Sequence, residues 1–129
     1  MRPFVLSMGD PAGIGPEITV KAWEALRGQA DLAFAVVAPP AVFAGQNFKI
    51  IANLTEAPDV FAEALPVLAI DGEAAASGQP NARHAAAITG SIDRAVTLCL
   101  SGDAAGMITN PIAKSVLYEA GFQFPGHTE

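Results

Sequence analysis

The sequence predicts an α/β protein with a largely parallel sheet. Short apolar runs, each the length of a strand buried on both faces, alternate along the chain with segments in which apolar residues recur every three or four positions. Clusters of Gly and Pro separate these segments, and helices are the usual connections between parallel strands. With 129 residues, of which 51% are apolar, the chain can form one compact domain around a core.

A strand, a loop and a helix are expected at the start of the chain. Residues 4–8 (FVLSM) form an uninterrupted apolar stretch that ends in a Gly- and Pro-rich turn, which is typical of a buried strand. Pro16 then suits the first position of a helix. Ile18, Ala22 and Leu26 follow at helical spacing, so we expect them to form the buried face of that helix.

Further strands and helices follow the same alternation. Strands are expected at residues 32–38, 48–51, 65–70 and 106–109. A short helix is expected at 41–44 and longer helices at 82–100 and 111–120. Residues 71–81 are expected to form a surface loop. Residues 53–66 carry mixed signals, and residues 65–70 are the strand best supported in that region. No internal repeat, linker or low-complexity tract interrupts this order.

The helix at residues 82–100 has the most regular pattern. Its apolar positions are Ala85, Ile88, Ile92, Val96 and Cys99. Gly102 is placed to end the helix. The chain has no second cysteine, so an internal disulfide is excluded, and we interpret the thiol of this helix as an inert core group.

The acidic composition restricts the kinds of partner. Only 16% of the residues are charged and the formal net charge is −6, so the surface lacks the positive charge that attracts nucleic acid or anionic lipid. The apolar run at residues 4–8 is too short for a signal peptide or a membrane span, and we expect a cytoplasmic protein. An acidic protein can still bind an anionic metabolite through backbone N–H groups, a helix N-terminus or a metal.

Three loops follow predicted strands, at the edge where ligands of open α/β sheets collect. Residues 9–15 (GDPAGIG) allow close backbone approach and lead into a helix N-terminus that can hold an anion. They match neither a Rossmann fingerprint, because the third glycine is missing, nor a P-loop, because Gly-Lys-Ser/Thr is absent. A tight turn stiffened by proline, without a ligand, explains these residues equally well.

The second and third loops carry the remaining polar candidates. Asn110 follows a strand and Lys114 lies one turn into the next predicted helix, where a solvated surface residue is the plainer interpretation. His127 and Thr128 bring an imidazole and a hydroxyl together, which suits a phosphate or carboxylate, although backbone partners alone would also satisfy the histidine. His84 is expected to be exposed, and the chain shows neither a metal-ligand cluster nor a Gly-x-Ser-x-Gly motif.

Taken together, these motifs resemble one enzyme family. Residues 8–17 (MGDPAGIGPE), 109–114 (TNPIAK), 120–122 (AGF) and 126–129 (GHTE) are similar to the 4-hydroxythreonine-4-phosphate dehydrogenases, as are residues 77–80 (SGQP) and the long helix. The motifs occur in the family's order and reach both ends of the chain, so the resemblance covers nearly all 129 residues.

This resemblance implies a fold and a reaction. The fold is the three-layer α/β/α arrangement of the isocitrate/isopropylmalate dehydrogenase-like group, in which two domains flank a cleft and subunits form homodimers. The family oxidises the 3-hydroxyl of 4-phosphohydroxy-L-threonine with NAD or NADP, and the 3-oxo acid then loses carbon dioxide to give 3-amino-2-oxopropyl phosphate. A divalent metal, Zn, Mg or Co, assists both steps by stabilising negative charge on the substrate oxygen.

The resemblance also implies roles for residues of this chain. His127 and Thr128 correspond to the His and Thr with which the family holds its substrate. The first loop resembles the Gly-Asp-Gly-Ile-Gly-Pro-Glu loop of isopropylmalate dehydrogenases, which lies near the nicotinamide, so Asp10, Gly13 and Gly15 are expected to contact the cofactor. We expect this loop and the His–Thr pair to converge on one phosphorylated metabolite.

The family's metal-binding histidines have no counterpart here, because they follow the Gly-His-Thr-Glu motif. We therefore expect residues 1–129 to be the N-terminal α/β portion of a longer two-domain dehydrogenase and to be inactive alone. Asn110 and Lys114 are expected to line the cleft. Two alternatives stay open: a sibling dehydrogenase of four-carbon sugar-acid phosphates such as D-threonate 4-phosphate, and a non-catalytic α/β binding module.

Overall fold

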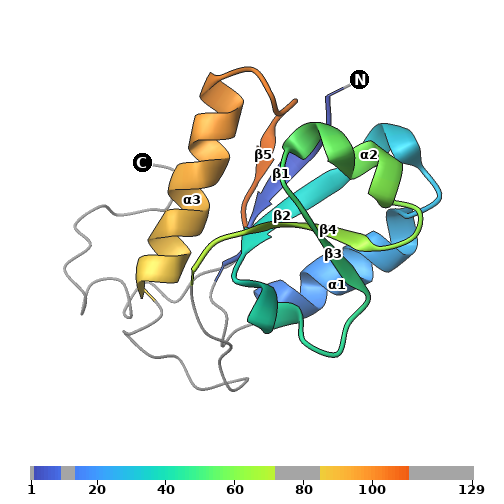
Figure 1. Cartoon of the computed structure of the whole chain (residues 1–129), viewed down its shortest axis with the longest axis horizontal. Helices are drawn as coiled ribbons and strands as arrows, with labels where there is room; N and C mark the ends of the chain where they lie inside the picture. The colour runs from blue at the N-terminus through green and yellow to red at the C-terminus, as the bar shows by residue number, and fades with distance from the viewer. Residues whose placement is uncertain (1, 10–13, 72–84, 111–129) are drawn as a thin grey trace.

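A parallel five-stranded sheet with helices on both faces forms the body of the molecule (Figure 1). The computed structural model describes residues 2–9, 14–71 and 85–110. The strands are β1 (Phe4–Ser7), β2 (Phe34–Ala38), β3 (Phe48–Ile51), β4 (Leu65–Ala69) and β5 (Met107–Ile108), and the helices are α1 (Gly15–Leu26), α2 (Ala57–Val60) and α3 (Ala85–Leu100). Short 3-10 turns occupy Ala30–Leu32, Pro40–Phe43 and Leu54–Glu56.

The sheet confirms the predicted α/β class. Its strand order is β3-β4-β2-β1-β5, and all four neighbouring pairs are parallel. The carboxyl ends of the strands therefore lie at one edge, where the chain turns from β1 into α1 and where residue 109 leaves β5. β1 pairs with β2 on one side and β5 on the other, so these two exits from the sheet are neighbours.

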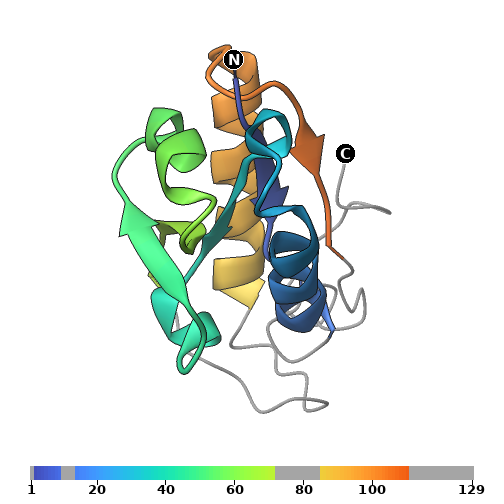
Figure 2. The same cartoon turned by 90° about the vertical axis from the view of Figure 1, so that its right-hand side faces the viewer.

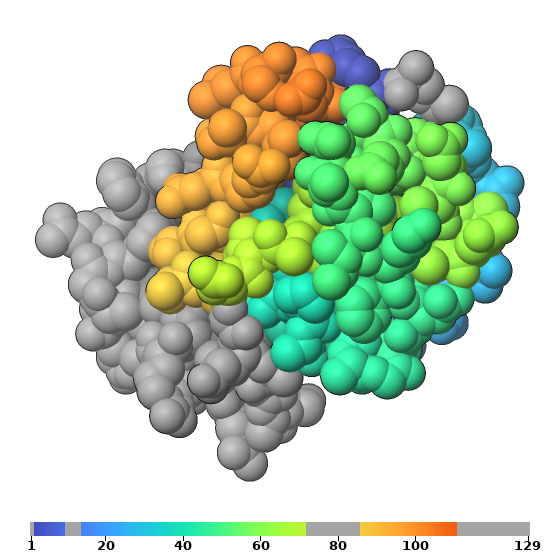
Figure 3. All heavy atoms as spheres, in the orientation of Figure 1, coloured from blue at the N-terminus to red at the C-terminus, as the bar shows by residue number. Residues whose placement is uncertain are grey.

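Alternate residues of the strands build two cores, one on each face of the sheet. Leu6, Phe34 and Val36 belong to a core that includes Trp23 of α1 and the first half of α3, whereas Val5 and Ala35 pack with the second half of α3 and the segment that contains α2. Figure 2 shows α1 and α3 on opposite sides of the strands, and Figure 3 shows α3 beside the chain that precedes β4. Because both faces are covered at the centre of the sheet, β2 and β4 are continuous apolar runs, as the sequence predicted, whereas the edge strand β3 carries Lys49 and is largely exposed.

The buried face of α1 differs from the predicted one. Ile18 is 41% exposed and Leu26 is only partly buried, whereas Thr19 and Trp23 are buried. The indole Nε1 of Trp23 donates to the carbonyl of Phe61 at 2.7 Å, so the largest side chain of the helix gains both apolar contacts and a hydrogen bond. The helix is thus rotated by about one residue, roughly 100°, from the predicted orientation.

The predicted pattern of α3 is confirmed at Ile88 and Ile92 and wrong at Val96. Ile88 and Ile92 are buried as predicted, but Val96 is 39% exposed, because the inward face continues through Ala95 and Leu98. Cys99 is half-buried against the same core, in agreement with a packed thiol. Gly102, with a φ of 85°, follows the end of the helix in the left-handed conformation that glycine favours.

Other expectations differ in detail or lie outside the described residues. Leu32 belongs to a 3-10 turn instead of a strand, and α2 occupies part of the segment that the sequence left unassigned. The predicted helix at 111–120 and the beginning of the long helix at 82–84 are not among the described residues. No helix in the described part of the chain has the length and hydropathy needed to cross a membrane.

Replacing Trp23 tests how α1 is held to the rest of the fold. Trp23→Phe keeps an aromatic ring but removes the donor to the buried carbonyl of Phe61, so we expect the free energy of unfolding in urea to fall by about 1–3 kcal/mol. Lys21→Ala, on the same helix, removes only an exposed pair with Glu17 and should change it by about 0.5 kcal/mol or less. Equal effects of the two substitutions would contradict this account.

Candidate functional site

A buried group of polar side chains lies at the carboxyl edge of the sheet. We call Asn110, Thr19 and Ser91 the edge cluster, because they join the end of β1 to the segment after β5, to α1 and to α3. All three are buried, although they come from distant parts of the sequence. Buried polar side chains need hydrogen-bond partners, and this cluster provides them.

Asn110 connects the two exits from the sheet. Its Nδ2 lies 2.9 Å from the carbonyl oxygen of Ser7 and 2.9 Å from Oγ1 of Thr19, and donates to both. Thr19 in turn donates its hydroxyl to the carbonyl of Gly15 at 2.8 Å. These three bonds fix the segment after β5 against the end of β1 and the first turn of α1.

Ser91 fixes the start of the first loop from the opposite face. Its Oγ accepts a hydrogen bond from the backbone N–H of Met8 at 2.8 Å and donates to the carbonyl of Val37 at 2.6 Å. One α3 hydroxyl therefore bridges β1 and β2 just where the two strands separate. Sequence reasoning did not identify this residue, although a lone Ser between apolar positions of the most regular helix was a usable signal.

Gly15 is required by the close packing of α1 against β1. A Cβ at this position would lie 2.6 Å from the carbonyl oxygen of Met8 and 3.3 Å from Cβ of Asn110. The predicted close backbone approach is thus present, and in the described residues the approaching group is the protein's own backbone. A contact between Gly15 and a cofactor stays a prediction.

The first turn of α1 also leaves polar groups without a side-chain cap. Ile14 occupies the capping position and its side chain has no acceptor, so among the described residues no side chain caps the first N–H groups of the helix. Nearby in the sequence, the hydroxyl of Ser7 is buried and has no partner among the described residues. The helix start is therefore open to hydrogen bonding from outside the described part of the chain.

Most of the predicted site residues cannot be placed. Asp10, Gly13, Lys114, His127 and Thr128 lie outside the described residues, so the expected convergence of the first loop with the His–Thr pair stays a prediction. His84 also lies outside them. What the structure does describe is that the loop after β1 and the segment after β5 leave the sheet side by side.

Asn110 is placed, and its position refines the expectation for it. The sequence suggested a residue lining the cleft, but this side chain is 5% exposed and its amide group donates into the fold. It holds the edge of a site together. A direct contact between Nδ2 of Asn110 and a ligand would require breaking one of these two hydrogen bonds.

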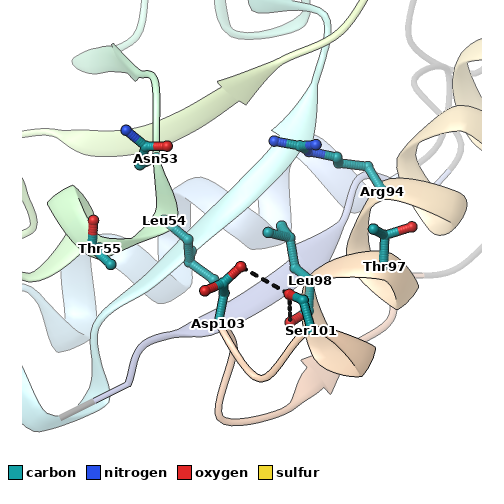
Figure 4. A pocket seen from close by; sticks show the side chains of 8 residues that line it. All are labelled: Asn53, Leu54, Thr55, Arg94, Thr97, Leu98, Ser101 and Asp103. Carbon is teal, nitrogen blue, oxygen red and sulfur yellow. Dashed lines mark hydrogen bonds between the residues drawn. The ribbon is translucent and has the colours of Figure 1, made fainter.

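A hollow of about 280 Å³ elsewhere on the molecule is a weaker candidate (Figure 4). It lies between the turn at Leu54 and the second half of α3, near the end of the helix that is remote from Ser91. Two of its three hydroxyls are already used, since Ser101 bonds to Asp103 at 2.8 Å and Thr97 donates to a backbone carbonyl. We therefore assign the candidate site to the carboxyl edge.

The described residues do not fit the divalent metal that the resemblance implies. No three His, Cys, Asp or Glu side chains in the described ranges are close enough to hold an ion. The described side chains at the carboxyl edge offer hydroxyl and amide groups, and the hydrogen bonds above already engage those of Thr19, Ser91 and Asn110. No catalytic step through a metal can be built from these residues.

Fold and site together define the chain as an α/β parallel-sheet protein with a buried polar cluster at the carboxyl ends of its central strands. More specifically, the model of the family "Pyridoxal phosphate biosynthetic protein PdxA" matches residues 20–129, and the chain belongs to this family. The match begins inside α1, so the first loop is not part of it.

Individual relatives agree with this assignment and include the first loop. The 4-hydroxythreonine-4-phosphate dehydrogenase of Caulobacter vibrioides is 47% identical over 133 residues, which cover 99% of this chain and 40% of that protein. The crystal structure of the enzyme of that name from Klebsiella pneumoniae superposes with a TM-score of 0.85 at 31% identity, over 99% of this chain and 42% of the other. The crystal structure of the enzyme of that name from Burkholderia phymatum superposes with a TM-score of 0.83 at 27% identity. The match covers 100% of this chain and 42% of the other.

These relatives are longer than the chain. The chain spans about 40% of the length of the curated relatives it matches. The matched part includes nearly every residue of this sequence, both loops at the carboxyl edge among them.

Gly15→Ala tests the contact between α1 and β1. The added methyl group would meet a backbone carbonyl at 2.6 Å, so either the helix or the end of β1 must move. We therefore expect the free energy of unfolding, measured in urea, to fall by about 1–3 kcal/mol. Gly28→Ala is the matched control, because nothing lies within 4 Å of its added Cβ. If Gly15→Ala is no more destabilising than this control, the contact is not as tight as described.

Proposed function

We propose that residues 1–129 are the N-terminal portion of a two-domain 4-hydroxythreonine-4-phosphate dehydrogenase that acts in pyridoxal phosphate biosynthesis. The observation that carries this proposal is the 47% identity to the Caulobacter vibrioides enzyme along 99% of the chain. Two solved enzymes of that name support it, because they have the same fold over at least 99% of the chain.

The reaction is the oxidation of an alcohol followed by loss of carbon dioxide. The 3-hydroxyl of 4-phosphohydroxy-L-threonine loses its proton, and C3 transfers a hydride to NAD or NADP. The resulting 3-oxo acid releases carbon dioxide and takes up a proton to give 3-amino-2-oxopropyl phosphate. A divalent metal, Zn, Mg or Co, would be held by ligands outside the described residues and would supply charge stabilisation.

Within this chain, two segments would share the binding of substrate and cofactor. We assign His127 and Thr128 to the substrate, since an imidazolium and a hydroxyl both donate to phosphate or carboxylate oxygens. Asp10, Gly13 and Gly15 are assigned to the cofactor, in the loop that enters the uncapped start of α1. The support for this division is that both segments leave the same edge of the sheet.

The setting of the enzyme follows from the same proposal. Its partner is a small phosphorylated hydroxy acid, and the acidic chain, with its net charge of −6, is unsuited to nucleic acid or anionic membranes. We propose a cytoplasmic homodimer once the remainder of the enzyme is present.

The 129-residue chain alone should not turn over substrate. Incubated with 4-phosphohydroxy-L-threonine, NAD or NADP and a divalent metal, it should give no reduced nicotinamide detectable by absorbance. The reason is that the chain spans about 40% of the length of the relatives it matches, so most of the enzyme is missing from it. The complete Caulobacter vibrioides enzyme serves as the positive control, and robust reduction by the short chain would disprove its role as an incomplete active site.

Binding to the chain can be tested separately from turnover. Titration calorimetry with 4-phosphohydroxy-L-threonine should detect weak binding that His127→Ala weakens by about tenfold or more, the effect of losing one charge-assisted hydrogen bond. His84→Ala provides the matched control and should leave the affinity unchanged. Absence of binding to the unaltered chain would favour a purely structural module, and tighter binding of D-threonate 4-phosphate would favour the sibling dehydrogenase.

A further inference from the structure

We propose that the hollow between the turn Leu54–Glu56 and the second half of α3 binds a small zwitterion, which carries an ammonium group at one end and a carboxylate or phosphate at the other. The hollow measures about 280 Å³ and lies away from the carboxyl edge, so this proposal does not rest on the proposed function. Its basis is that a guanidinium and a carboxylate line one hollow without pairing with each other (Figure 4).

Arg94 supplies an exposed cation that has no partner. The described part of the chain contains one ion pair, between Lys21 and Glu17, and the guanidinium of Arg94 forms no hydrogen bond there. Figure 4 shows this side chain extending from α3 towards the side of the hollow where Asn53 lies. A planar guanidinium presents paired N–H groups that match two oxygens of a carboxylate or phosphate. Arg94 can therefore bind the anionic end of a ligand.

Asp103 supplies the opposite charge. Its Oδ2 accepts a hydrogen bond from the hydroxyl of Ser101 at 2.8 Å, and its backbone N–H donates to the carbonyl of Leu98 at 3.1 Å. These two bonds hold the carboxylate near the end of α3. A carboxylate offers about four lone-pair sites, so one hydroxyl leaves room for an ammonium group. Asp103 can therefore bind the cationic end.

An apolar floor lies between the two charges. Leu54 and Leu98 are buried in the same core, and Figure 4 shows them between the side chains of Arg94 and Asp103. Such a floor suits a short run of CH₂ groups. Ligand sites commonly have volumes of about 300–1,000 Å³, so this hollow accepts a molecule about the size of an amino acid. The hydroxyl of Thr55, which has no partner among the described residues, adds a donor at the rim.

The charges of the chain favour a zwitterion over a simple ion. The formal net charge is −6, and Asp103 within the hollow would repel an anion that Arg94 attracts. A simple cation would meet the same conflict at Arg94. A ligand that carries both charges is attracted at both ends, and the net charge of the complex does not change.

Both walls of the hollow are fixed before a ligand binds. Oε2 of Glu56 accepts hydrogen bonds from the backbone N–H groups of Ala52 and Asn53, both at 2.8 Å, and so holds the turn. The other wall is the regular helix α3. Binding would therefore order little besides the side chain of Arg94. Exposed ion pairs contribute little individually, so we expect dissociation constants of about 1 mM.

The test is an NMR titration of the whole 129-residue chain with two probes, 4-aminobutyrate and 2-aminoethyl phosphate. The Nε–H signal of Arg94 should shift, with that of Arg27, which donates to the carbonyl of Ala62 at 2.9 Å, as the internal reference. Butyrate, which lacks the ammonium group, should bind about fivefold more weakly than 4-aminobutyrate. Binding of both probes supports the shared chemistry, and binding of one supports the site and identifies its anionic group.

Two substitutions at exposed side chains separate the two ends of the ligand. Arg94→Gln should weaken the binding of the probes about fivefold, whereas Lys21→Gln, which removes the same charge from α1 on the opposite face of the sheet, should change it less than about twofold. Asp103→Asn keeps an acceptor for Ser101 and should weaken the binding of 4-aminobutyrate but not that of butyrate. Asp31→Asn, which removes the same charge outside the hollow, is its matched control.

Several results would overturn the proposal. It fails if neither probe shifts the Arg94 signal, if butyrate binds as well as 4-aminobutyrate, or if Arg94→Gln and Lys21→Gln have equal effects. It also fails if Asp103→Asn weakens both ligands equally or has no more effect than Asp31→Asn. None of these results bears on the proposed function, because these substitutions leave the residues assigned to substrate and cofactor unchanged.

Discussion

The contact between the first turn of α1 and the end of β1 is the constraint on which the carboxyl edge depends. Gly15 lies so close to the carbonyl of Met8 that any Cβ would collide with it. This approach brings the hydroxyl of Thr19 within reach of Asn110, and Asn110 within reach of Ser7. A larger residue at the start of α1 would separate these groups and leave buried donors and acceptors without partners, which costs more than the hydrogen bonds contribute when formed.

The strands could be predicted from the sequence, and the contacts of the helices could not. A strand covered on both faces has to be apolar at every position, so β1, β2 and β4 are recognisable without knowledge of their neighbours. A helix buries only one stripe, and which stripe it buries depends on what it meets. In α1, Trp23 finds a carbonyl acceptor and turns inward, while Ile18, the more apolar choice by pattern, stays exposed.

The contacts within the candidate site were even less predictable from the sequence than those of the helices. Its loops were predictable, because ligands of parallel sheets collect at the carboxyl ends of the strands and the chain carries unusual residues there. The burial of Asn110 was not, since its partners Ser7 and Thr19 are 103 and 91 residues away in the sequence. Ser91 was missed for the same reason: a serine in an apolar helix is recognisable as polar, but its bonds to two strands exist only in the folded chain.

Charge at the start of α1 supports the division of roles between the two loops. A helix N-terminus attracts anions, but Glu17 places a carboxylate in the first turn, and its pair with Lys21 at 3.4 Å is exposed and screened. A phosphate at this helix start would meet that negative charge. The oxidised nicotinamide ring carries a positive charge and would be attracted by it, whereas the phosphate of the substrate is better matched by the imidazole and hydroxyl of residues 127 and 128. Because NAD and NADP also carry a negatively charged pyrophosphate, Glu17 would be matched to the nicotinamide end of the proposed cofactor and not to its phosphates.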